Sequence, residues 1–397
     1  MQTLLLVGVG RMGRPYLAAA RRLGVRIHAV EVAANAAALG PLVDEVTVCP
    51  GISDEDWAFA AHAAVAARRP DGVLAFSEPQ VMAAALVCDE LGLPGPSLRA
   101  AVVSRNKALQ RARFAAAGIG QPDFLLAGRL AEAATWAAER FPVVVKPLSS
   151  AGSDGVELVA DAGAFERVVA RRAGEGRLLV ERAVTGPEFS WEALVQEGKV
   201  WLSNLTEKET NGPPRFVEVA HRLPAAVDAA ARAEADDLGA AVIDALGMRT
   251  GLVHLEFRRS PAGPRVMEVA VRTPGDFLLN LLGLAYGVDW FELAVTVALG
   301  RDLPAPPVAQ PRHAASYLPI APPGTVTALT DLPEVTALPA VVDAGYWVAV
   351  GDAVVPATSS VNRFGYALLA ADDRAALERA LDEVRATFTV QIAADGA

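Results

Sequence analysis

The amino-acid sequence predicts an α/β protein that opens with a parallel, doubly wound unit. Residues 2–7 form an apolar run, which is followed by the glycine-rich turn 8–13 (GVGRMG), a helical pattern to about Leu23 and a second strand at 25–30. Strand, glycine turn, helix and strand in this order are typical of the start of a parallel sheet. With 397 residues, 52% of them hydrophobic, the chain can bury a sizeable core in two or three domains.

The rest of the chain continues to mix helical and strand patterns. A cluster of turn residues at 93–97 ends the first unit, and four prolines in the eight residues 304–311 are typical of a connector. Further helices are expected at about 54–69, 79–91, 97–104, 106–117, 161–173, 225–247, 276–286, 289–299 and 372–386, and strands at 72–76, 142–147, 156–160, 177–180, 188–204, 251–258 and 264–270.

Charge and composition exclude several classes of protein. The net charge is −10 and the pI about 5.1, without a basic run, so we expect no nucleic-acid partner. No apolar run reaches the ~18 residues that span a bilayer. The chain enters a strand directly after Met1 without a basic leader, which predicts a cytoplasmic protein with no membrane partner. Cys49 and Cys88 fit no zinc pattern and are expected to be reduced thiols.

Lysine is scarce in this chain. Of 36 basic residues only four are lysines, at positions Lys107, Lys146, Lys199 and Lys208. Arginine is a planar fork, whereas lysine is a compact point charge on a flexible stem. A lysine kept in such an arginine-rich chain is therefore a candidate for a position that requires a point charge.

The glycine turn has two interpretations. Its spacing fits the dinucleotide-binding fingerprint, and Glu31, 18 residues after Gly13, would suit a ribose-binding carboxylate. Many α/β units, however, begin with such a turn only to pack a helix on a strand. A nicotinamide-dependent oxidoreductase is thus kept as a minor alternative.

A loop of small and polar residues follows the strand that ends at Lys146. Residues 149–155 (SSAGSDG) allow successive backbone N–H groups to approach an anion, and the lysine adds a positive charge. Lys107, which also lies beside a turn, would add another. The sequence therefore predicts phosphate binding here, and the alternative is a polar hairpin loop.

Two glutamates, Glu256 and Glu268, occupy the two strands of one predicted hairpin. Each lies in an otherwise apolar strand, where an unpaired carboxylate is costly. Mg²⁺ is commonly held by one or two carboxylates together with substrate phosphates, so the pair predicts a metal site. The alternative is that both face solvent and pair with Arg258 and Arg272.

On these motifs, taken in order and spacing, the chain resembles the ATP-grasp superfamily, and within it the carboxylate–amine ligases similar to L-amino-acid ligases. The resemblance runs from the N-terminus to about residue 300 and more loosely to the end. Its specific parts are SRNK at 104–107, VVVKP at 143–147 with the loop after it, ERAVTGPEFSWE at 181–192, HLEFR at 254–258 and EVAVRTPG at 268–275.

The resemblance implies an ATP-grasp fold in four parts. These are a Rossmann-like N-terminal subdomain (1–96), a central subdomain with a phosphate lid (97–182), a catalytic α+β subdomain with the metal site (183–303) and a C-terminal subdomain (304–397).

The same resemblance implies the cofactors and the residues that bind them. ATP would be held with Mg²⁺, or alternatively Mn²⁺, and Glu256 and Glu268 would be the metal ligands. The loop 149–155 would fold over the phosphates as a lid. The residues implied to bind ATP are Lys107, Lys146, Ser149, Ser150, Gly152, Ser153, Glu181, Arg182, Ala183, Val184 and Glu188.

On the substrate side the resemblance implies two catalytic residues, Arg272 at the reacting carbonyl and His221 at the leaving phosphate or its proton. It also implies that Glu218 binds an α-ammonium group and that Glu78 and Gly275 face the substrate. Many ATP-grasp enzymes have Asn two residues after the second metal glutamate, whereas this chain has Ala270, which favours the amine-ligase subgroup.

The implied activity is an ATP-dependent ligase that activates a carboxylate as an acyl phosphate and joins it to an amine. Its partners would be small-molecule carboxylates and amines, with amino acids foremost, in an enzyme that acts alone or as a homodimer. The alternatives left open are another ATP-grasp ligase of purine-pathway, carboxylase or carrier-protein type, and a nucleotide sensor without catalysis.

Overall fold

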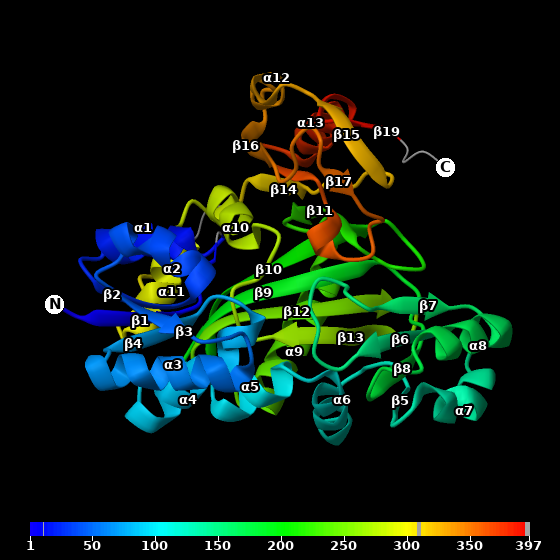
Figure 1. Ribbon diagram of the computed structural model, residues 1–397, viewed down its shortest axis with the longest axis horizontal. Coiled ribbons are helices and arrows are strands. Elements are labelled where there is room, and N and C mark those ends of the chain that lie inside the picture. Colours follow the sequence, from blue (N-terminus) through cyan, green and yellow to red (C-terminus); the bar gives the residue numbers. More distant parts are fainter. Residues whose placement is uncertain (11, 308–310, 394–397) are drawn as a thin grey trace.

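The computed structural model describes residues 1–10, 12–307 and 311–393, which form four sheets with helices packed around them (Figure 1). Arg11 of the glycine turn, residues 308–310 of the expected connector and the last four residues lie outside this description. The predicted α/β class is confirmed by this arrangement, in which three antiparallel sheets follow one parallel sheet.

The N-terminal unit is a parallel sheet with helices on both faces, as expected. Two of its elements were missed, α2 and β3, because α2 is a short alanine-rich helix without a turn signal and β3 is a half-exposed edge strand. The strands are β1 (Thr3–Val7), β2 (Arg26–Val32), β3 (Glu45–Cys49) and β4 (Gly72–Ala75) in the order β3-β2-β1-β4, and the helices are α1 (Arg14–Arg22), α2 (Ala33–Leu39), η1 (Gly40–Leu42), α3 (Asp54–Ala67), η2 (Glu78–Gln80) and α4 (Val81–Leu91).

The central part is a small antiparallel sheet with its own apolar core. That core is built around Val143, Val145 and Val180 and is covered by Phe165 of α8. Before it come α5 (Leu98–Ser104) and α6 (Lys107–Ala116); the sheet has the order β5-β8-β6-β7, with β5 (Phe124–Ala127), η3 (Leu130–Ala133), α7 (Ala134–Ala138), β6 (Val143–Pro147), β7 (Glu157–Val159), α8 (Ala162–Arg171) and β8 (Leu178–Arg182).

The largest sheet has eight antiparallel strands in the order β13-β12-β9-β10-β11-β14-β18-β16. Its strands come from both sides of residue 304, and the division at 96, 182 and 303 stays a prediction. The elements are β9 (Glu188–Gln196), β10 (Lys199–Thr210), β11 (Glu218–Leu223), α9 (Ala229–Leu246), β12 (Gly251–Ser260), β13 (Gly263–Ala270), α10 (Leu278–Tyr286), α11 (Trp290–Ala298), β14 (His313–Tyr317), β16 (Val341–Tyr346) and β18 (Gly365–Ala371).

The C-terminal part, drawn in orange and red in Figure 1, adds a three-stranded sheet of order β17-β15-β19. The helix α13 packs on β14 and β18 through Leu377, Leu381 and Val384. The elements of this part not yet given are β15 (Gly324–Leu329), α12 (Leu332–Thr336), β17 (Ala353–Val354), η4 (Ser360–Asn362), α13 (Arg374–Thr387) and β19 (Val390–Ala393).

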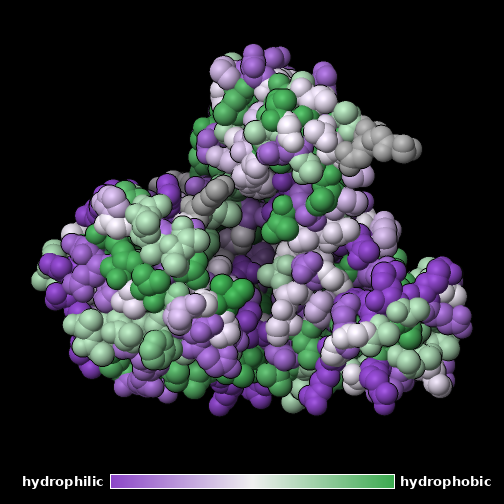
Figure 2. Space-filling view, in the orientation of Figure 1, coloured by the Kyte–Doolittle hydropathy of each residue, from purple (hydrophilic) through white to green (hydrophobic). Residues whose placement is uncertain are grey.

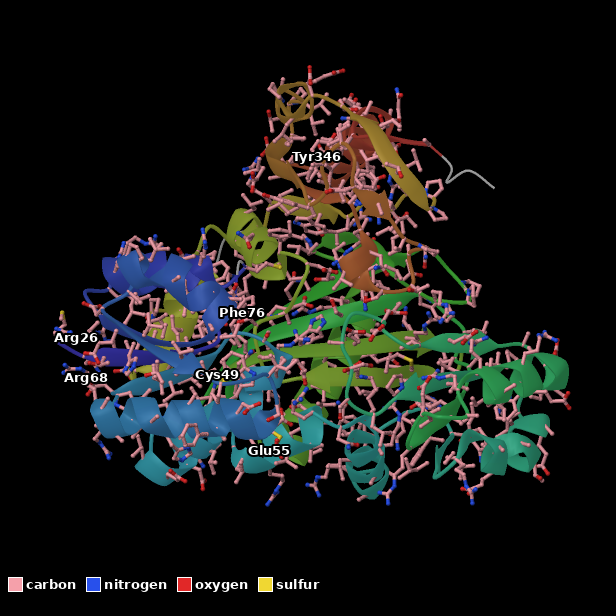
Figure 3. All side chains as sticks on the ribbon, viewed as in Figure 1. Arg26, Cys49, Glu55, Arg68, Phe76 and Tyr346 are labelled. Atoms are coloured by element: carbon pink, nitrogen blue, oxygen red, sulfur yellow. The ribbon has the colours of Figure 1, made fainter. Side chains whose placement is uncertain are left out.

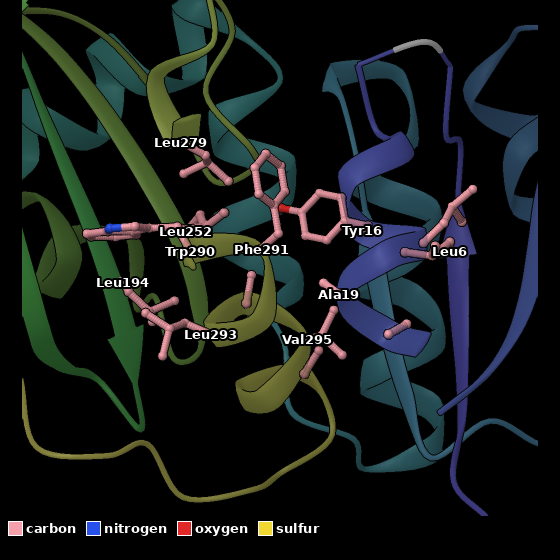
Figure 4. Packing of buried hydrophobic residues seen from close by; sticks show 14 of the residues in the cluster. Leu6, Tyr16, Ala19, Leu194, Leu252, Leu279, Trp290, Phe291, Leu293 and Val295 are labelled. Carbon is pink, nitrogen blue, oxygen red and sulfur yellow. The ribbon is translucent and has the colours of Figure 1, made fainter. Parts of the chain in front are cut away.

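One apolar core joins the N-terminal unit to the large sheet, with α11 between them (Figure 4). Phe291 packs edge-on against Tyr16 of α1, with 5.0 Å between the ring centroids, while the neighbouring Trp290 lies beside Leu194 and Leu252 of the large sheet. The N-terminal unit is therefore fixed on the rest of the chain by a helix encoded far along the sequence.

Among the described residues no single helix is long and apolar enough to cross a membrane, though α10 and α11, bent by 107° between them, pass that test as a pair.

The carboxyl ends of the parallel strands point toward the centre of the molecule. Figure 3 places Phe76, just after β4, near this centre, whereas Arg26 and Arg68 lie at the outer end of the sheet. Both of these arginines pair with Glu45. Loops that follow parallel strands are where ligands of open α/β sheets bind, so the inner end is the one suited to a site.

Candidate active site

A cavity of about 400 Å³ lies between the central sheet and the large sheet. Figure 2 shows that this face of the molecule is hollowed at its centre, with hydrophilic residues inside the hollow. Of the residues expected to bind ATP or metal, those that line the cavity are Lys107, Lys146, Ser150, Gly152, Ser153, Glu181, Arg182, Ala183, Val184, Glu188, Glu256 and Glu268.

Two lysines with buried side chains supply positive charge to this cavity. Lys107 is the first residue of α6, which Asn106 caps through its side chain, and its Nζ lies 3.0 Å from Glu268 Oε1. The Lys146 Nζ lies 2.7 Å from Glu181 Oε2, and Arg111 Nε donates to Glu181 Oε1 at 2.5 Å. Burial alone would raise the pKa of Glu181, but the charges of the two cations outweigh it and lower this pKa.

The sequence motifs did not identify Arg111 as a site residue. It lies four residues after Lys107 on α6, so both side chains share one face of the helix, and that spacing was the available signal.

The loop 149–155 curves at the edge of the cavity. Gly152, Ser153 and Gly155 have φ values of +64°, +58° and +70°, the left-handed region that favours glycine. The Ser153 hydroxyl donates to the carbonyl oxygen of Phe216 at 3.0 Å, which ties the loop to the connection between β10 and β11. Ser149, expected to bind ATP, is exposed and is not part of the cavity lining.

The segment from Glu181 to Val184 runs along the cavity wall at the end of β8. Its backbone is held by neighbours, since the Ala183 N–H donates to the Pro142 carbonyl at 3.0 Å and Arg258 donates to the Val184 carbonyl at 3.1 Å. Arg258 also makes two hydrogen bonds to Glu188, at 3.0 and 2.8 Å.

Glu256 and Glu268 lie directly opposite each other on β12 and β13 and both line the cavity. The alternative that they pair with Arg258 and Arg272 is wrong, because those arginines pair with Glu188 and Glu78. The described residues contain no group of three or more carboxylate, His or Cys side chains arranged as a complete metal site. Two opposed carboxylates that line one cavity nevertheless fit Mg²⁺, which takes its other ligands from phosphates and water.

Lys208 on β10 is the central residue that was missed as a site residue. Its Nζ lies 2.9 Å from Glu188 Oε1, 3.2 Å from Glu218 Oε1 and 2.8 Å from Glu256 Oε2, and its side chain is 1% exposed. The scarcity of lysine was the signal that could have found it. Lys107 and Lys146 have buried side chains that line the cavity, and the buried Lys208 contacts three carboxylates that line it, whereas Lys199 is exposed.

His254 adds a second cation to this cluster. Its Nδ1 lies 3.0 Å from Glu192 Oε1 and its Nε2 lies 3.1 Å from Glu256 Oε1. Burial alone would lower the pKa of this imidazole, but the two carboxylates outweigh it and raise the pKa to about 9. Glu256 thus faces a lysine and an imidazolium, and its pKa lies well below the usual value despite its burial.

The expected substrate-side residues lie next to this cavity, and a β-bulge orients two of them. Glu218 is opposite Thr210 and Ala220 is opposite Glu209, so β11 carries one extra residue, Val219. The bulge brings Glu218 and His221 to one face of the strand, although residues three apart normally face opposite ways. Glu218 lines the cavity, and His221 lies outside its lining.

His221 contacts a carboxylate that was not expected. Its Nε2 lies 2.9 Å from Asp276 Oδ2, and Arg363 makes two hydrogen bonds to the same carboxylate. Arg272 Nε donates to Glu78 Oε2 at 3.0 Å, which brings these two predicted residues together. Arg272, Glu78 and Gly275 lie outside the cavity lining.

The glycine turn binds a carboxylate of its own chain. Glu31 Oε2 accepts hydrogen bonds from the backbone N–H groups of Val9 and Gly10, at 2.9 and 2.8 Å. A Cβ on Gly8 would lie 2.6 Å from the Gln80 side chain, so a protein side chain lies where a ligand would approach. These contacts favour the structural interpretation of the turn over a dinucleotide site.

Three family models match this chain in succession. The ATP-grasp N-terminal domain matches residues 17–95, the ATP-grasp domain matches residues 139–279, and the L-amino acid ligase C-terminal domain 2 matches residues 316–393. Together with the fold, these matches show that the chain belongs to the ATP-grasp superfamily. Within the superfamily it resembles the L-amino acid ligases, whose C-terminal domain it shares.

Individual proteins and solved structures are also similar to this chain. Carnosine synthase 1 of Gallus gallus is 33% identical over 349 residues, which cover 78% of this chain and 36% of that protein. The chain therefore spans little more than a third of that relative. The L-amino acid ligase from Bacillus licheniformis has a similar fold, with a TM-score of 0.85 and 22% identity over 100% of this chain and 99% of that one. The phosphoribosylglycinamide synthetase from Anaerococcus prevotii is also similar, with a TM-score of 0.78 and 17% identity over 99% and 100% of the two chains.

Proposed function

We propose that this chain is an ATP-dependent carboxylate–amine ligase that forms an amide bond between amino acids through an acyl phosphate. The observation that carries the proposal is the shared cavity, in which two lysines, a loop of left-handed residues and two opposed glutamates line one space of about 400 Å³. A space lined by both lysines and a pair of carboxylates suits a nucleoside triphosphate with its metal.

In the first step a substrate carboxylate oxygen attacks the γ-phosphorus of ATP, and ADP leaves. Lys107 and Lys146, which line the cavity, are proposed to offset the negative charge that spreads over the phosphoryl oxygens. When bound between Glu256 and Glu268, Mg²⁺ would neutralise phosphate charge and orient the phosphates. The loop 149–155 would exclude water, which matters because an acyl phosphate hydrolyses readily.

In the second step the amine nitrogen attacks the acyl carbon, and phosphate leaves. Arg272, which Glu78 holds by one hydrogen bond, is the proposed donor to the oxyanion of the tetrahedral intermediate. His221 is proposed to hold the leaving phosphate or its proton, and Glu218 to bind the α-ammonium group of a substrate. A cytoplasmic location and a homodimer remain predictions.

A second candidate is a purine-pathway ligase of the same fold. It is favoured by sequence relatives named formate-dependent phosphoribosylglycinamide formyltransferase, one of which is 26% identical over 76% of this chain and 76% of that protein. In that case a phosphoribosyl amine or formate would replace the amino acids.

The test is ADP release by the purified chain with Mg²⁺ and ATP across a matrix of paired amino acids and small amines, with phosphoribosylamines and formate as a second arm. Release that requires two added substrates, together with an amide product of the summed mass less water, supports the proposal. Release only in the second arm supports the purine-type alternative. Tight ATP binding without turnover in either arm would leave a nucleotide sensor as the better description.

A further inference from the structure

Residues 359–363 of the C-terminal part reach the loop 149–155 at the cavity; Figure 1 shows this segment, in orange, descending from β17. The Ser360 N–H donates to the Gly152 carbonyl oxygen at 2.9 Å, and the Ser359 hydroxyl donates to the same oxygen at 3.2 Å. A Cβ added to Gly152 would lie 3.1 Å from the Ser360 Cβ, so the two backbones pack closely. Two hydrogen bonds to one carbonyl oxygen thus hold the loop against the C-terminal part.

The same segment also contacts the substrate side of the site. Arg363 makes two hydrogen bonds to the Asp276 carboxylate, at 2.9 and 2.6 Å, and one to the Ser360 carbonyl oxygen at 2.7 Å. Asp276 in turn lies 2.9 Å from His221 Nε2. The Ser360 hydroxyl donates to Glu218 Oε2, also at 2.9 Å. One short turn is therefore bonded directly to the loop and to Glu218, and it is linked to His221 through Asp276.

The Arg363–Asp276 pair holds a strained backbone. Asp276 and Phe277 have φ values of +55° and +61°, a region that residues with side chains rarely adopt and that persists only where neighbours enforce it. Arg363 is 7% exposed. Burial alone would raise the pKa of Asp276, but the guanidinium outweighs it and holds this pKa well below its usual range. Breaking a buried pair of this kind leaves an uncompensated charge and is costly, so the arrangement is firmly set.

We propose that Arg363 is a positioning residue that couples closure of the loop 149–155 to the placement of Glu218 and His221. The turn 359–363 supports both the loop and the substrate-side residues. Closure of the loop therefore also fixes the positions of Glu218 and His221. This inference rests on the proposed function for the roles of the loop and of β11, and adds that the C-terminal part links them.

The position of the loop 149–155 determines which nucleophile reaches the acyl phosphate. With the loop held, the amine is the available nucleophile. With the loop released, the oxygen of water attacks the acyl carbon, phosphate leaves and the carboxylate is regenerated. Loss of Arg363 therefore separates ADP formation from amide formation.

The test uses the full chain and hydrogen–deuterium exchange with Mg²⁺ and the non-hydrolysable analogue AMP-PNP. In the wild type, nucleotide is expected to slow exchange in 149–155, 216–222 and 359–363 together. In Arg363→Gln, exchange in 149–155 with nucleotide present is expected to be roughly tenfold faster, because the turn 359–363 loses the bonds to Asp276 that fix it and its two hydrogen bonds to Gly152 are weakened. Peptide 216–222 is expected to lose its protection as well.

Arg374→Gln is the matched control, because Arg374, in the same C-terminal part, pairs with Glu378 of α13 and Glu207 of β10 and makes no ion pair with the loop. Its exchange in 149–155 is expected to equal that of the wild type. A second variant, Ser360→Ala, removes only the bond to Glu218 and keeps the backbone bond to Gly152. It is expected to speed exchange in 216–222 and leave 149–155 unchanged.

Equal protection of the loop in the wild type and Arg363→Gln would overturn the proposal, as would protection of 216–222 that does not depend on Arg363. If Arg363→Gln does not fold, the double variant Ser359→Ala/Ser360→Ala replaces it. Exchange in 149–155 and 216–222 is then expected to be several-fold faster than in the wild type. Exchange equal to that of the wild type would contradict the proposal. The exchange readout needs nucleotide but no second substrate, so it stands even if no amide forms. Where an amide does form, Arg363→Gln is expected to release more ADP per amide than Arg374→Gln.

Discussion

The carboxylates at the cavity each pair with a cationic side chain. Glu181 faces Lys146 and Arg111, Glu268 faces Lys107, and Glu256 faces Lys208 and His254. Removing one partner of a buried ion pair leaves a charge without compensation, and this costs more than the pair contributes when intact. Substitutions that remove the charge of one of these residues are therefore expected to destabilise the chain, even where the new side chain keeps the shape.

Lys208→Met tests the lysine at the centre of this cluster. It leaves three carboxylates facing one another, so the free energy of unfolding is expected to fall by about 3–5 kcal/mol, measured by urea denaturation at neutral pH. Lys199→Met, on the exposed end of the same strand, is the matched control and is expected to stay within about 0.5 kcal/mol of the wild type. Equal stability of the two variants would show that the Lys208 contacts contribute little.

His254→Gln tests the buried imidazolium through pH. The pKa of His254 is raised from 6.5 to about 9, so its contribution is fully present below pH 6.5 and is lost as pH rises through 9. The stability difference between wild type and His254→Gln is expected to shrink by up to about 3 kcal/mol across this window. A difference that does not change between pH 6 and pH 9.5 would contradict the raised pKa.

Arg272→Lys tests the proposed oxyanion donor. Lysine keeps the charge but loses the planar fork, so kcat for amide formation is expected to fall on the order of 10²–10³-fold while ATP binding persists. Arg265→Lys, on β13 just before Arg272 in the chain, serves as the control and should leave kcat unchanged. A fall in ATP affinity alone would instead place Arg272 among the nucleotide-binding residues.

At the scale of elements, packing between distant segments positions the site. The carbonyl of Ala298, at the end of α11, lies where a Cβ on Gly72 of β4 would be, at 2.4 Å. This close approach packs the amino-terminal end of β4 directly against α11, which lies between the parallel sheet and the large sheet. Likewise, the extra residue Val219 in β11 turns Glu218 and His221 to one face.

Gly72→Ala is therefore expected to destabilise the chain by about 1–3 kcal/mol, because the added methyl forces β4 away from α11. Gly40→Ala is the matched control in the same unit. Gly40 has a helical φ of −45° and no atom within 4 Å of the added Cβ, so this change is expected to be neutral or to stabilise by up to about 1 kcal/mol. Thermal or chemical unfolding measures both, and equal effects would argue against the tight contact.

At the scale of the whole molecule, the central sheet, the large sheet and the C-terminal part all contribute to one cavity or to the loop above it. A ligand bound there contacts parts that are far apart in sequence and stabilises them together. Binding to the folded state alone raises stability by about 2.7 kcal/mol when the ligand is present at a hundred times its Kd.

ATP with Mg²⁺ is accordingly expected to raise the unfolding temperature by several degrees, measured by scanning fluorimetry. NADH at the same concentration is expected to leave it unchanged, because Glu31 already occupies the amides of the glycine turn. Glu268→Gln should keep a shift with ATP but lose most of the added effect of Mg²⁺. A shift with NADH in place of ATP would revive the oxidoreductase alternative.

The sequence by itself determined the fold class, the parallel opening unit and the motifs of the cavity, since each depends on local patterns: an apolar run before a glycine turn, a lysine before small residues, glutamates in apolar strands. Contacts between segments far apart in sequence were decided by the tertiary structure alone. Lys208 meets three carboxylates on three strands, and Arg363 lies 87 residues from Asp276. Such contacts leave no periodic pattern, because strand order, one bulge and the docking of the C-terminal part bring these side chains together.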